Sequence, residues 1–243
     1  TVIGQSIGIL QSMRIQQAAG LNGNRYATFH QLGKEQAQKL HEDDRLYDVG
    51  DTIFIGSTPL GNSSLSLYLR EYHDNALSMY PAIGNVKEGR LPEEAIEIAL
   101  SEDALQYLGL DAVIGDTVSL DLSVSVMDGS LSELEYSADF VLTGILESSY
   151  IGYASGTVEG IVGEGTAEEL LPEEYLLYST DFKTYDKQNF QSIIYALAED
   201  LNVDERYIQY NWVLLDAIGI SYDEAADSDT GTGFSFMTAA CIL

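Results

Sequence analysis

Cysteine and basic side chains are scarce in this chain of 243 residues. The one cysteine, Cys241, excludes an intrachain disulfide, but it does not decide the redox compartment, because disulfide-free exported proteins and cytosolic proteins share this feature. Lys and Arg number 11 against 39 Asp and Glu, which gives a formal net charge of −28 at pH 7. Proteins that bind nucleic acid or lie on anionic lipid need clustered Lys and Arg. The composition therefore argues against both partners and predicts a well-solvated acidic surface.

The sequence also lacks the motifs that carry common chemistries. Its three histidines, His30, His41 and His73, are far apart and form no H-x-x-x-H pair, so their spacing predicts no zinc site. There is no G-x-S-x-G nucleophile elbow, and Gly33-Lys34 lacks the other residues of a phosphate-binding loop. We therefore predict no catalytic residue, no cofactor-binding residue, no metal ligand and no cofactor, and we expect a protein that is not an enzyme.

Two acidic patterns leave other interpretations open. Adjacent carboxylates such as Glu93-Glu94 are compatible with a carboxylate-based hydrolase, although a glycosidase needs two carboxylates across a cleft, which a sequence does not show. Residues 227–231 have the opening spacing of a calcium loop, but Thr238 stands where the closing Glu should fall. We expect a solvated acidic linker there, with a weak cation site as the alternative.

Long apolar runs are missing as well. No stretch of about 18 apolar residues predicts a membrane span, and no basic segment followed by an apolar one opens the sequence as a signal peptide would. Both ends are nevertheless apolar while the middle is acidic: residues 1–21 predict an amphipathic helix, and residues 234–243 are uncharged. These ends predict either terminal elements that pack on the core or segments that continue into membrane helices. The apolar face of the first helix carries Ile3, Ile7, Leu10 and Met13.

Hydrophobic residues make up 45% of the chain, which suffices for a packed core, and their periodicity predicts alternating strands and helices. The first third has the strand–helix–strand pattern that opens an α+β unit. Its predicted elements are strands at 26–32, 46–55 (broken near Gly50-Asp51) and 65–72, and a helix at 34–41.

Residues 80–146 give the clearest secondary-structure predictions in the sequence. They predict a strand at 95–100, a helix that begins after the N-cap Ser101 and ends at Gly109, and two alternating strands joined by a hairpin at residues 127–130. The two strands are at 117–126 and 135–146, and Arg90, Asp116 and Gly144 are expected to serve turns and strand ends.

The rest of the chain predicts a second strand–helix–strand element after a glycine-rich loop at 152–168. The expected elements are a strand at 176–179, a helix with Asp186 as its N-cap and Phe190, Ile193, Ile194, Leu197 and Leu201 on its core face, and a strand at 207–215. The chain has 16 tyrosines, and we expect those on strands to pack one side against the core, with an exposed binding surface as the alternative. The aromatic residues in question are Tyr136, Tyr150, Tyr153, Tyr207, Tyr210 and Trp212.

Four motifs in the central stretch occur in a recognisable order. Residues 87–101, 104–109, 114–118 and 140–146 read KEGRLPEEAIEIALS, ALQYLG, IGDTV and FVLTGIL. This ordered set resembles the extracytoplasmic core domain of FtsX/MacB-type ABC transporter permeases, of the Gram-positive type. The sharp part of the resemblance covers about a quarter of the chain, and weaker flanking similarity extends over nearly all of it.

The resemblance implies an α+β fold with a particular domain organisation. A porter-like βαβ subdomain would be built from both chain ends, residues 23–89 and 176–233, and residues 90–175 would form an inserted β-rich subdomain. Residues 1–22 would be a stalk helix that continues from a membrane helix, and residues 234–243 would begin the next membrane helix.

The resemblance also implies a function. The chain would be the non-catalytic extracellular domain of an ABC transporter permease in the cell membrane, coupling cytoplasmic ATP hydrolysis to export or mechanotransmission at the cell surface. Its partners would be a cytoplasmic ABC ATPase subunit, a second permease copy in a dimer, and a peptide, lipoprotein or cell-wall hydrolase, with no nucleic acid. The strong acidity and the glycine-rich loop are not family hallmarks, so no partner surface is carried over. The alternative from a different class is a free acidic extracellular binding module for a peptide, glycan or cation.

Overall fold

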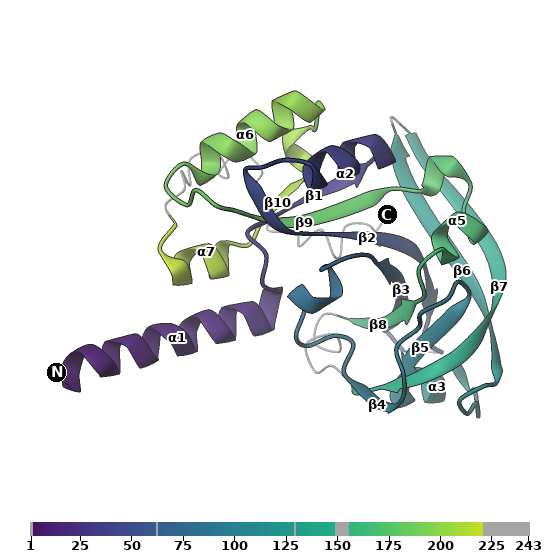
Figure 1. The fold of residues 1–243 in the computed structure, drawn as a ribbon. Helices are drawn as coiled ribbons and strands as arrows, with labels where there is room; N and C mark the ends of the chain where they lie inside the picture. Colours follow the sequence, from purple (N-terminus) through teal and green to yellow (C-terminus); the bar gives the residue numbers. More distant parts are fainter. Residues whose placement is uncertain (1, 62, 129, 149–155, 221–243) are drawn as a thin grey trace. The chain divides into compact units, whose positions relative to one another are not determined.

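The computed structural model describes residues 2–61, 63–128, 130–148 and 156–220 (Figure 1). The calcium-like pattern at 227–231, the apolar segment 234–243 and the tip of the predicted hairpin at Gly129 lie outside these residues. So do Tyr150, Tyr153 and Cys241. Within the described ranges, no helix is long and apolar enough to cross a membrane.

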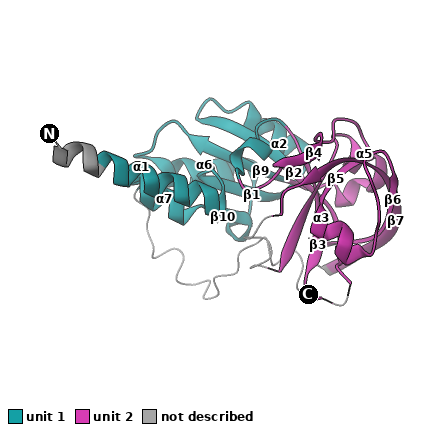
Figure 2. Ribbon diagram, turned by 90° about the horizontal axis from the view of Figure 1, so that it is seen from below, with its two compact units in different colours: residues 1–51, 74–81, 179–234 teal, residues 52–73, 82–178, 235–243 magenta. Residues whose placement is uncertain are grey.

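The chain forms two compact units (Figure 2). Unit 1 comprises residues 1–51, 74–81 and 179–234, and unit 2 comprises residues 52–73, 82–178 and 235–243. The predicted insert, residues 90–175, lies within the unit 2 segment 82–178, and unit 2 also takes residues 52–73 from the chain before it.

Unit 1 is a small sheet with strand order β10-β1-β9-β2, flanked by helices. Helices α2 and α6 lie next to each other in Figure 1, and the Gln36 side-chain amide of α2 donates to the Leu201 carbonyl of α6 at 2.8 Å. Helix α1 contacts α7. The elements are α1 (Val2–Asn22), β1 (Ala27–Leu32), α2 (Lys34–His41), the first half of β2 (Leu46–Pro59), η1 (Leu77–Met79), β9 (Tyr178–Thr184), α6 (Phe190–Leu201), η3 (Glu205–Tyr207), β10 (Ile208–Tyr210) and α7 (Trp212–Ile218).

The core of unit 1 is aromatic at its centre. Phe29 of β1 and Phe182 of β9 are fully buried and meet edge to face, with ring centroids 5.2 Å apart. Phe190 begins the apolar face of α6 and meets Tyr26 in a second edge-to-face contact at 6.3 Å. Ile194, Leu197 and Leu201 continue that face at helical spacing and are buried, whereas Ile193 is half-buried, as the periodicity predicts for a core-facing helix.

Unit 2 is a mixed sheet with strand order β2-β3-β8-β5-β7-β4. Strands β3 and β8 pair in parallel, as do β5 and β7, whereas β6 and β7 form a long antiparallel hairpin from Thr117↔Val141 to Asp128↔Ser130. The elements are the second half of β2, β3 (Ser66–Tyr72), β4 (Val86–Gly89), β5 (Glu97–Ser101), α3 (Glu102–Leu108), β6 (Thr117–Asp128), β7 (Ser130–Leu146), β8 (Thr157–Val162), α5 (Thr166–Leu170) and η2 (Glu173–Tyr175).

The α+β class and several local predictions are confirmed. Helix α2 has the predicted bounds, Lys34–His41. Ser101 caps α3, because its hydroxyl accepts the Ala104 amide at 3.2 Å, and Gly109 ends the helix in the left-handed conformation. These features depend on a few consecutive residues, which is why the sequence predicts them.

Four local predictions are wrong. Residues 152–168 are not a loop throughout, because they contain β8 and α5. Gly160 lies inside β8, and a Cβ there would fall 2.5 Å from the Leu69 side chain and 2.7 Å from that of Leu100, so this glycine serves close packing rather than a turn. Strand β2 also continues through Gly50 instead of breaking there.

The other two wrong predictions concern the end of unit 1. Only Ile208–Tyr210 form a strand; Asn211 then caps a helix, its Oδ1 accepting the Leu214 amide at 3.4 Å. The apolar run that follows Asn211 suits a buried helix as well as a strand, so periodicity does not separate the two. Asp186 accepts the amides of Gln188 and Asn189, but α6 begins only at Phe190.

Candidate functional site

The C-terminal end of α1 is held by a dense set of polar contacts within unit 1. The helix ends at Gly23, whose φ of +83° is a left-handed conformation that glycine adopts without strain. The Gly23 amide donates to the Ala19 carbonyl at 2.9 Å. A Cβ at Gly23 would lie 2.8 Å from the Tyr80 ring, so the backbone conformation and the neighbouring ring both require glycine.

The segment that follows Gly23 is hydrogen-bonded to two other parts of unit 1. The Asn24 amide donates to the Met79 carbonyl at 2.6 Å. The buried Asn211 side chain donates through Nδ2 to the carbonyls of Gly23 and Arg25, at 2.8 and 2.9 Å. Because Met79 and Asn211 come from distant parts of the chain, these bonds tie the C-terminal end of α1 to the rest of unit 1.

Arg25 is buried, and its guanidinium connects four groups. Nε forms an ion pair with Asp181 Oδ1 at 2.9 Å and donates to Thr28 Oγ1. Nη2 donates to Gln209 Oε1 at 3.1 Å, and Nη1 donates to the Asn22 carbonyl. One side chain thus joins the last turn of α1 to β1, β9 and β10.

Asp181 is the shared acceptor of this network. Tyr80 donates its hydroxyl to Asp181 Oδ2 at 2.6 Å, and Thr28 donates to Oδ1. Burial raises the pKa of the Asp181 carboxyl, and Arg25, Thr28 and Tyr80 oppose that shift. Burial acts to lower the pKa of Arg25, but Tyr80 and Asp181 outweigh it and the net shift is upward. The α1 anchor, as we name this set, consists of Asn22, Gly23, Arg25, Thr28, Tyr80, Asp181 and Asn211.

Residues 9–13 of the same helix are exposed rather than anchored. Ile9, Leu10 and Met13 are exposed, so in these residues the helix does not pack on the core, which is one of the two alternatives for this end of the chain. An exposed row of large apolar side chains is typical of a contact surface. Helix α1 is therefore anchored at its C-terminal end and presents the apolar side chains of Ile9, Leu10 and Met13 to solvent.

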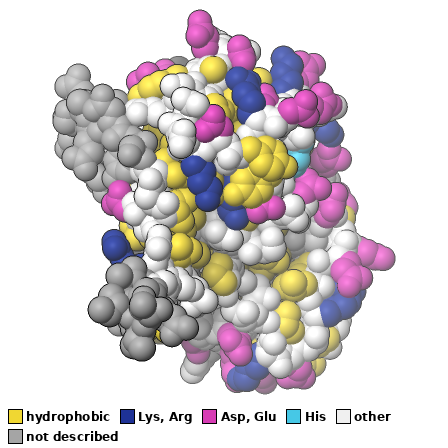
Figure 3. Space-filling model, turned by 60° about the vertical axis from the view of Figure 1, so that its left-hand side comes forward, with side chains coloured by type: hydrophobic (Ala, Val, Ile, Leu, Met, Phe, Trp, Pro, Cys, Tyr) yellow, Lys and Arg dark blue, Asp and Glu magenta, His cyan; other side chains and the backbone are white. Residues whose placement is uncertain are grey.

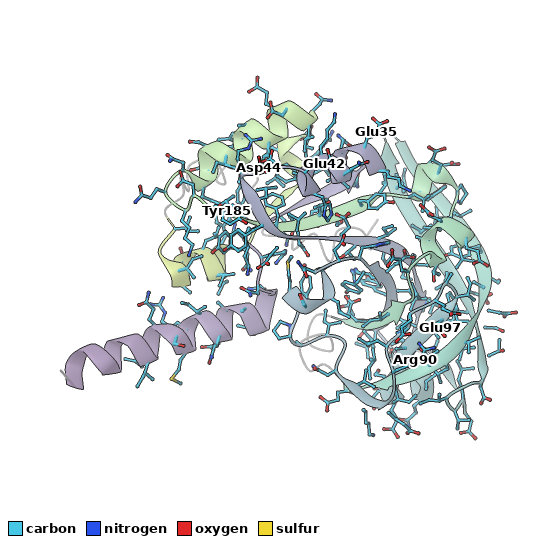
Figure 4. The ribbon with its side chains drawn as sticks, in the orientation of Figure 1. Glu35, Glu42, Asp44, Arg90, Glu97 and Tyr185 are labelled. Atoms are coloured by element: carbon cyan, nitrogen blue, oxygen red, sulfur yellow. The ribbon has the colours of Figure 1, made fainter. Side chains whose placement is uncertain are left out.

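In unit 2, the residues expected to serve turns and strand ends do so. The carboxylate of Glu97 accepts both ends of the Arg90 guanidinium, at 2.8 and 2.6 Å (Figure 4), and the amides of Glu93 and Glu94. Hydrogen bonds from Arg90 lower the pKa of Glu97 to about 2, aided by those two amides. This arrangement gives the backbone of Glu93 and Glu94 a local structural role.

Of the remaining two residues, Asp116 serves a turn of unit 2, and Gly144 lies in strand β7 close to its end. Asp116 Oδ2 accepts the Val113 amide at 2.9 Å. A Cβ at Gly144 would lie 2.2 Å from the Arg90 carbonyl oxygen, which explains why glycine occupies that strand position.

The structure places the three histidines in separate surroundings. His30 contacts Ser179 and Gln209 in unit 1, at 2.9 and 3.1 Å. His73 lies 2.7 Å from Glu71 in unit 2. His41, in contrast, lies next to two aspartates, and among the described residues this is a group of side chains that could hold a metal ion.

The tyrosines divide between packed and exposed positions. Tyr136 packs in the hairpin core of unit 2 and donates its hydroxyl to the Ile55 carbonyl at 2.7 Å. Tyr210 stacks on Trp212 at 4.5 Å in unit 1. Tyr185 is exposed and stacks on Tyr47 at 4.8 Å, so among the tyrosines that the structure describes it fits an exposed binding surface (Figure 4).

Acidic side chains do not gather at one place on the face drawn in Figure 3. Asp and Glu form several separate groups there, with Lys and Arg side chains among them. Sequence reasoning missed the α1 anchor altogether, because Arg25 and Asp181 are 156 positions apart and no motif links them.

Comparisons with known proteins bear on the fold. No protein-family model matches this sequence. No curated protein matches it either. The periplasmic region of MacB from Actinobacillus actinomycetemcomitans aligns over 84% of this chain and 96% of its own, with 14% identity and a TM-score of 0.49.

A second solved structure is the extracellular domain of the noncanonic ABC-type transporter YknZ from Gram-positive bacteria. It aligns over 77% of this chain and 99% of its own, with 12% identity and a TM-score of 0.50. The motif-based expectation is thus confirmed at the level of the fold: this chain has the α+β fold of the extracellular domain of YknZ.

Proposed function

We propose that this chain is the non-catalytic extracellular domain of an ABC transporter permease. In this proposal it lies at the outer side of the cell membrane and couples cytoplasmic ATP hydrolysis to export or mechanotransmission. The observation that carries the proposal is the likeness to the YknZ extracellular domain, which extends over nearly all of that domain. The partners proposed are a cytoplasmic ABC ATPase and a second permease copy, with a peptide, lipoprotein or cell-wall hydrolase outside the cell.

The geometry of α1 supports a mechanical role. A helix whose C-terminal end is fixed by Arg25, Asn211 and the turn at Gly23 moves together with unit 1. A displacement applied to its N-terminal end is therefore transmitted to the sheet of unit 1 rather than absorbed at a hinge. We propose α1 as the stalk that receives motion from a membrane helix, and the domain division at residues 23–89, 90–175 and 176–233 remains part of this proposal.

The first test is the gene itself. Apolar runs of about 20 residues on both sides of this chain, and a neighbouring gene with a phosphate-loop motif, are expected for a permease. A signal peptide directly before the chain and a stop codon directly after it would overturn the proposal.

The second test measures coupling in the full-length protein reconstituted with its ATPase. Nitroxide labels at Glu35→Cys, an exposed position on α2, report the distance between two permease copies in a Cys241→Ser background. We expect this distance to shift when ATP is bound and trapped. Gln11→Pro kinks the exposed part of α1 and should abolish the shift, whereas Gln11→Ala should preserve it. An equal shift in Gln11→Pro would exclude α1 as the coupling element, and no dipolar signal at all would exclude the dimer.

A second candidate function is a free acidic binding module. The observation that favours it is exposed Tyr185, stacked on Tyr47 with Lys183 over the Tyr47 ring at 5.6 Å. Exposed aromatic rings with neighbouring polar groups are suited to stacking on glycans or peptides. A glycan array in which binding disappears with Tyr185→Ala but not with Tyr195→Ala, a second exposed tyrosine, would favour this alternative.

A further inference from the structure

Three metal-ligating side chains meet in unit 1. His41 ends α2, Asp51 lies in β2, and Asp74 follows β3. His41 Nε2 lies 3.0 Å from Asp51 Oδ2 and 3.9 Å from Asp74 Oδ2. One potential ligand atom from each residue lies within 4.8 Å of the other two, so two carboxylates face a single imidazole nitrogen.

The backbone around Gly50 brings this group together. A Cβ at Gly50 would lie 2.3 Å from the Ala76 nitrogen and 2.9 Å from the Asn75 carbonyl carbon. Only glycine leaves room for residues 75–76 to lie directly on β2, and this approach places Asp74 beside Asp51. The same glycine explains why β2 does not break here, since its role is close backbone contact rather than a turn.

Asp51 is oriented before any ion arrives. Its side chain is 10% exposed, and Thr180 donates to its Oδ1 at 2.6 Å, which leaves Oδ2 directed at His41. Hydrogen bonds that orient a ligating carboxylate in this way are typical of metal sites. The His41 side chain is 27% exposed and that of Asp74 is 62% exposed, so the group is open to solvent on one side.

The donor set and its spacing match zinc. Two ligand atoms bound at about 2.05 Å in a tetrahedron lie about 3.4 Å apart, between the two His41 distances of 3.0 and 3.9 Å. One imidazole nitrogen and two carboxylate oxygens suit Zn²⁺ better than Ca²⁺ or Mg²⁺, which prefer oxygen ligands alone. We propose that His41 Nε2, Asp51 Oδ2 and Asp74 Oδ2 form a Zn²⁺ site, with water as the fourth ligand.

The proposed ion would cross-link the end of α2, strand β2 and the segment at residues 74–76. The ion would offset the repulsion between the carboxylates of Asp51 and Asp74, which both face the His41 imidazole. It would also raise the free energy of unfolding, because the unfolded chain does not hold the three ligands together. The site stands independently of the transport proposal, since its argument uses only contacts within unit 1.

The test is a ZnCl₂ titration of the full 243-residue chain, followed by calorimetry and by the NMR signals of its three histidine rings. We expect one tight equivalent of Zn²⁺ and a shift of the His41 ring nitrogen signals, with His30 and His73 unchanged. Asp74→Asn should weaken binding at least tenfold and His41→Ala should remove the site. Excess Mg²⁺ should not displace the Zn²⁺.

The matched control is Asp44→Asn, an exposed aspartate in the turn after α2 that removes the same charge (Figure 4). It should bind Zn²⁺ as the native chain does. Zinc binding that persists in Asp74→Asn and His41→Ala, or that falls equally in Asp44→Asn, would show binding to the acidic surface only and overturn the site. No heat and no ring shift would overturn it as well. Because Asp74 is exposed, Asp74→Asn is expected to fold, so its result remains decisive if His41→Ala does not.

Discussion

Each unit contains an arginine–carboxylate pair whose side chains are at most 12% exposed, and the two pairs are built differently. In unit 1, the side chains of Arg25 and Asp181 are 7% and 2% exposed. Their hydrogen bonds reach the last turn of α1 and three strands. In unit 2, the side chains of Arg70 and Glu159 are 11% and 12% exposed and come from the adjacent parallel strands β3 and β8.

The second pair is local. The Arg70 guanidinium lies 5.7 Å from the Phe54 ring centroid and 5.5 Å from that of Tyr68, so aromatic rings surround it. Glu159 Oε2 has no hydrogen-bond partner among the described residues. Burial raises the pKa of Glu159 as it does that of Asp181, and the arginine opposes it in both cases. The comparison indicates that the Arg25–Asp181 pair connects segments that are distant in the sequence. The Arg70–Glu159 pair, in contrast, packs beside aromatic side chains within unit 2.

The largest expected effect is that of Arg25→Met. Removing one partner of a buried ion pair typically costs about 3–5 kcal/mol of the free energy of unfolding, because the other charge stays buried. The double variant Arg25→Met/Asp181→Leu should remain destabilised, since the Tyr80 hydroxyl, Gln209 and the Asn22 carbonyl each still lose one hydrogen bond. Urea unfolding followed by the fluorescence of Trp212, the one tryptophan of the chain and part of unit 1, measures both. Recovery of native stability in the double variant would contradict the idea that Arg25 and Asp181 connect α1 to the strands of unit 1.

The next largest effect is expected for Arg70→Met, and it distinguishes the Arg70–Glu159 pair from the Arg25–Asp181 pair. Arg70→Met alone should cost about 3 kcal/mol, for the same reason as in unit 1. The double variant Arg70→Met/Glu159→Leu should return to within about 1 kcal/mol of the native chain or exceed it, because apolar side chains of similar volume replace an ion pair between two adjacent strands. Urea unfolding followed by circular dichroism checks this. If the double variant in unit 2 stays as destabilised as the one in unit 1, the comparison fails.

A smaller effect is expected at the glycine that ends α1. Gly23→Ala must adopt a φ of +83° and meets the Tyr80 ring, so it should lower the free energy of unfolding by about 1–2 kcal/mol. Gly20→Ala is the matched control, because nothing lies within 4 Å of a Cβ there and alanine favours a helix interior by about 0.5–1 kcal/mol. Thermal unfolding should therefore shift in opposite directions for the two variants. Equal shifts would show that Gly23 is not conformationally required.

The sequence predicts features that a few neighbouring residues determine. Helix α2, the Ser101 cap of α3 and the end of α3 at Gly109 are of this kind. The motifs at 87–146 are also short stretches of consecutive residues, so their order along the chain can be read from the sequence. Gly160 leads to the wrong prediction of a loop, because its role depends on residues that are distant in the sequence. Its role is to admit side chains from β3 and β5, and the strand in which it lies has no other signal strong enough to outweigh a glycine-rich composition.

The polar contacts of the α1 anchor and of the proposed metal site could not be predicted from the spacing of residues in the sequence. Arg25 and Asp181 meet only after β1 and β9 have paired with their neighbours in one sheet, and His41 meets Asp74 only because Gly50 admits the backbone of residues 75–76. Hydrophobic periodicity places such residues on a strand or helix but does not say which partner lies opposite. Buried polar networks between distant segments therefore remain invisible until the topology is known.

The smallest expected effect is at Glu97, where the ion pair is local and its arginine lies near solvent. Because Arg90 lowers the pKa of Glu97 to about 2 from an ordinary value of 4.5, the carboxylate stabilises the folded state above pH 4.5 and loses that contribution as the pH falls toward 2. The thermal midpoint of Glu97→Gln should therefore lie below that of the native chain at pH 6 and converge with it near pH 2, and added salt should narrow the gap at pH 6. Glu94→Gln, which removes an adjacent exposed carboxylate that accepts no bond from Arg90, controls for net charge. A gap that stays constant across this range would mean that Glu97 acts through packing rather than through its charge.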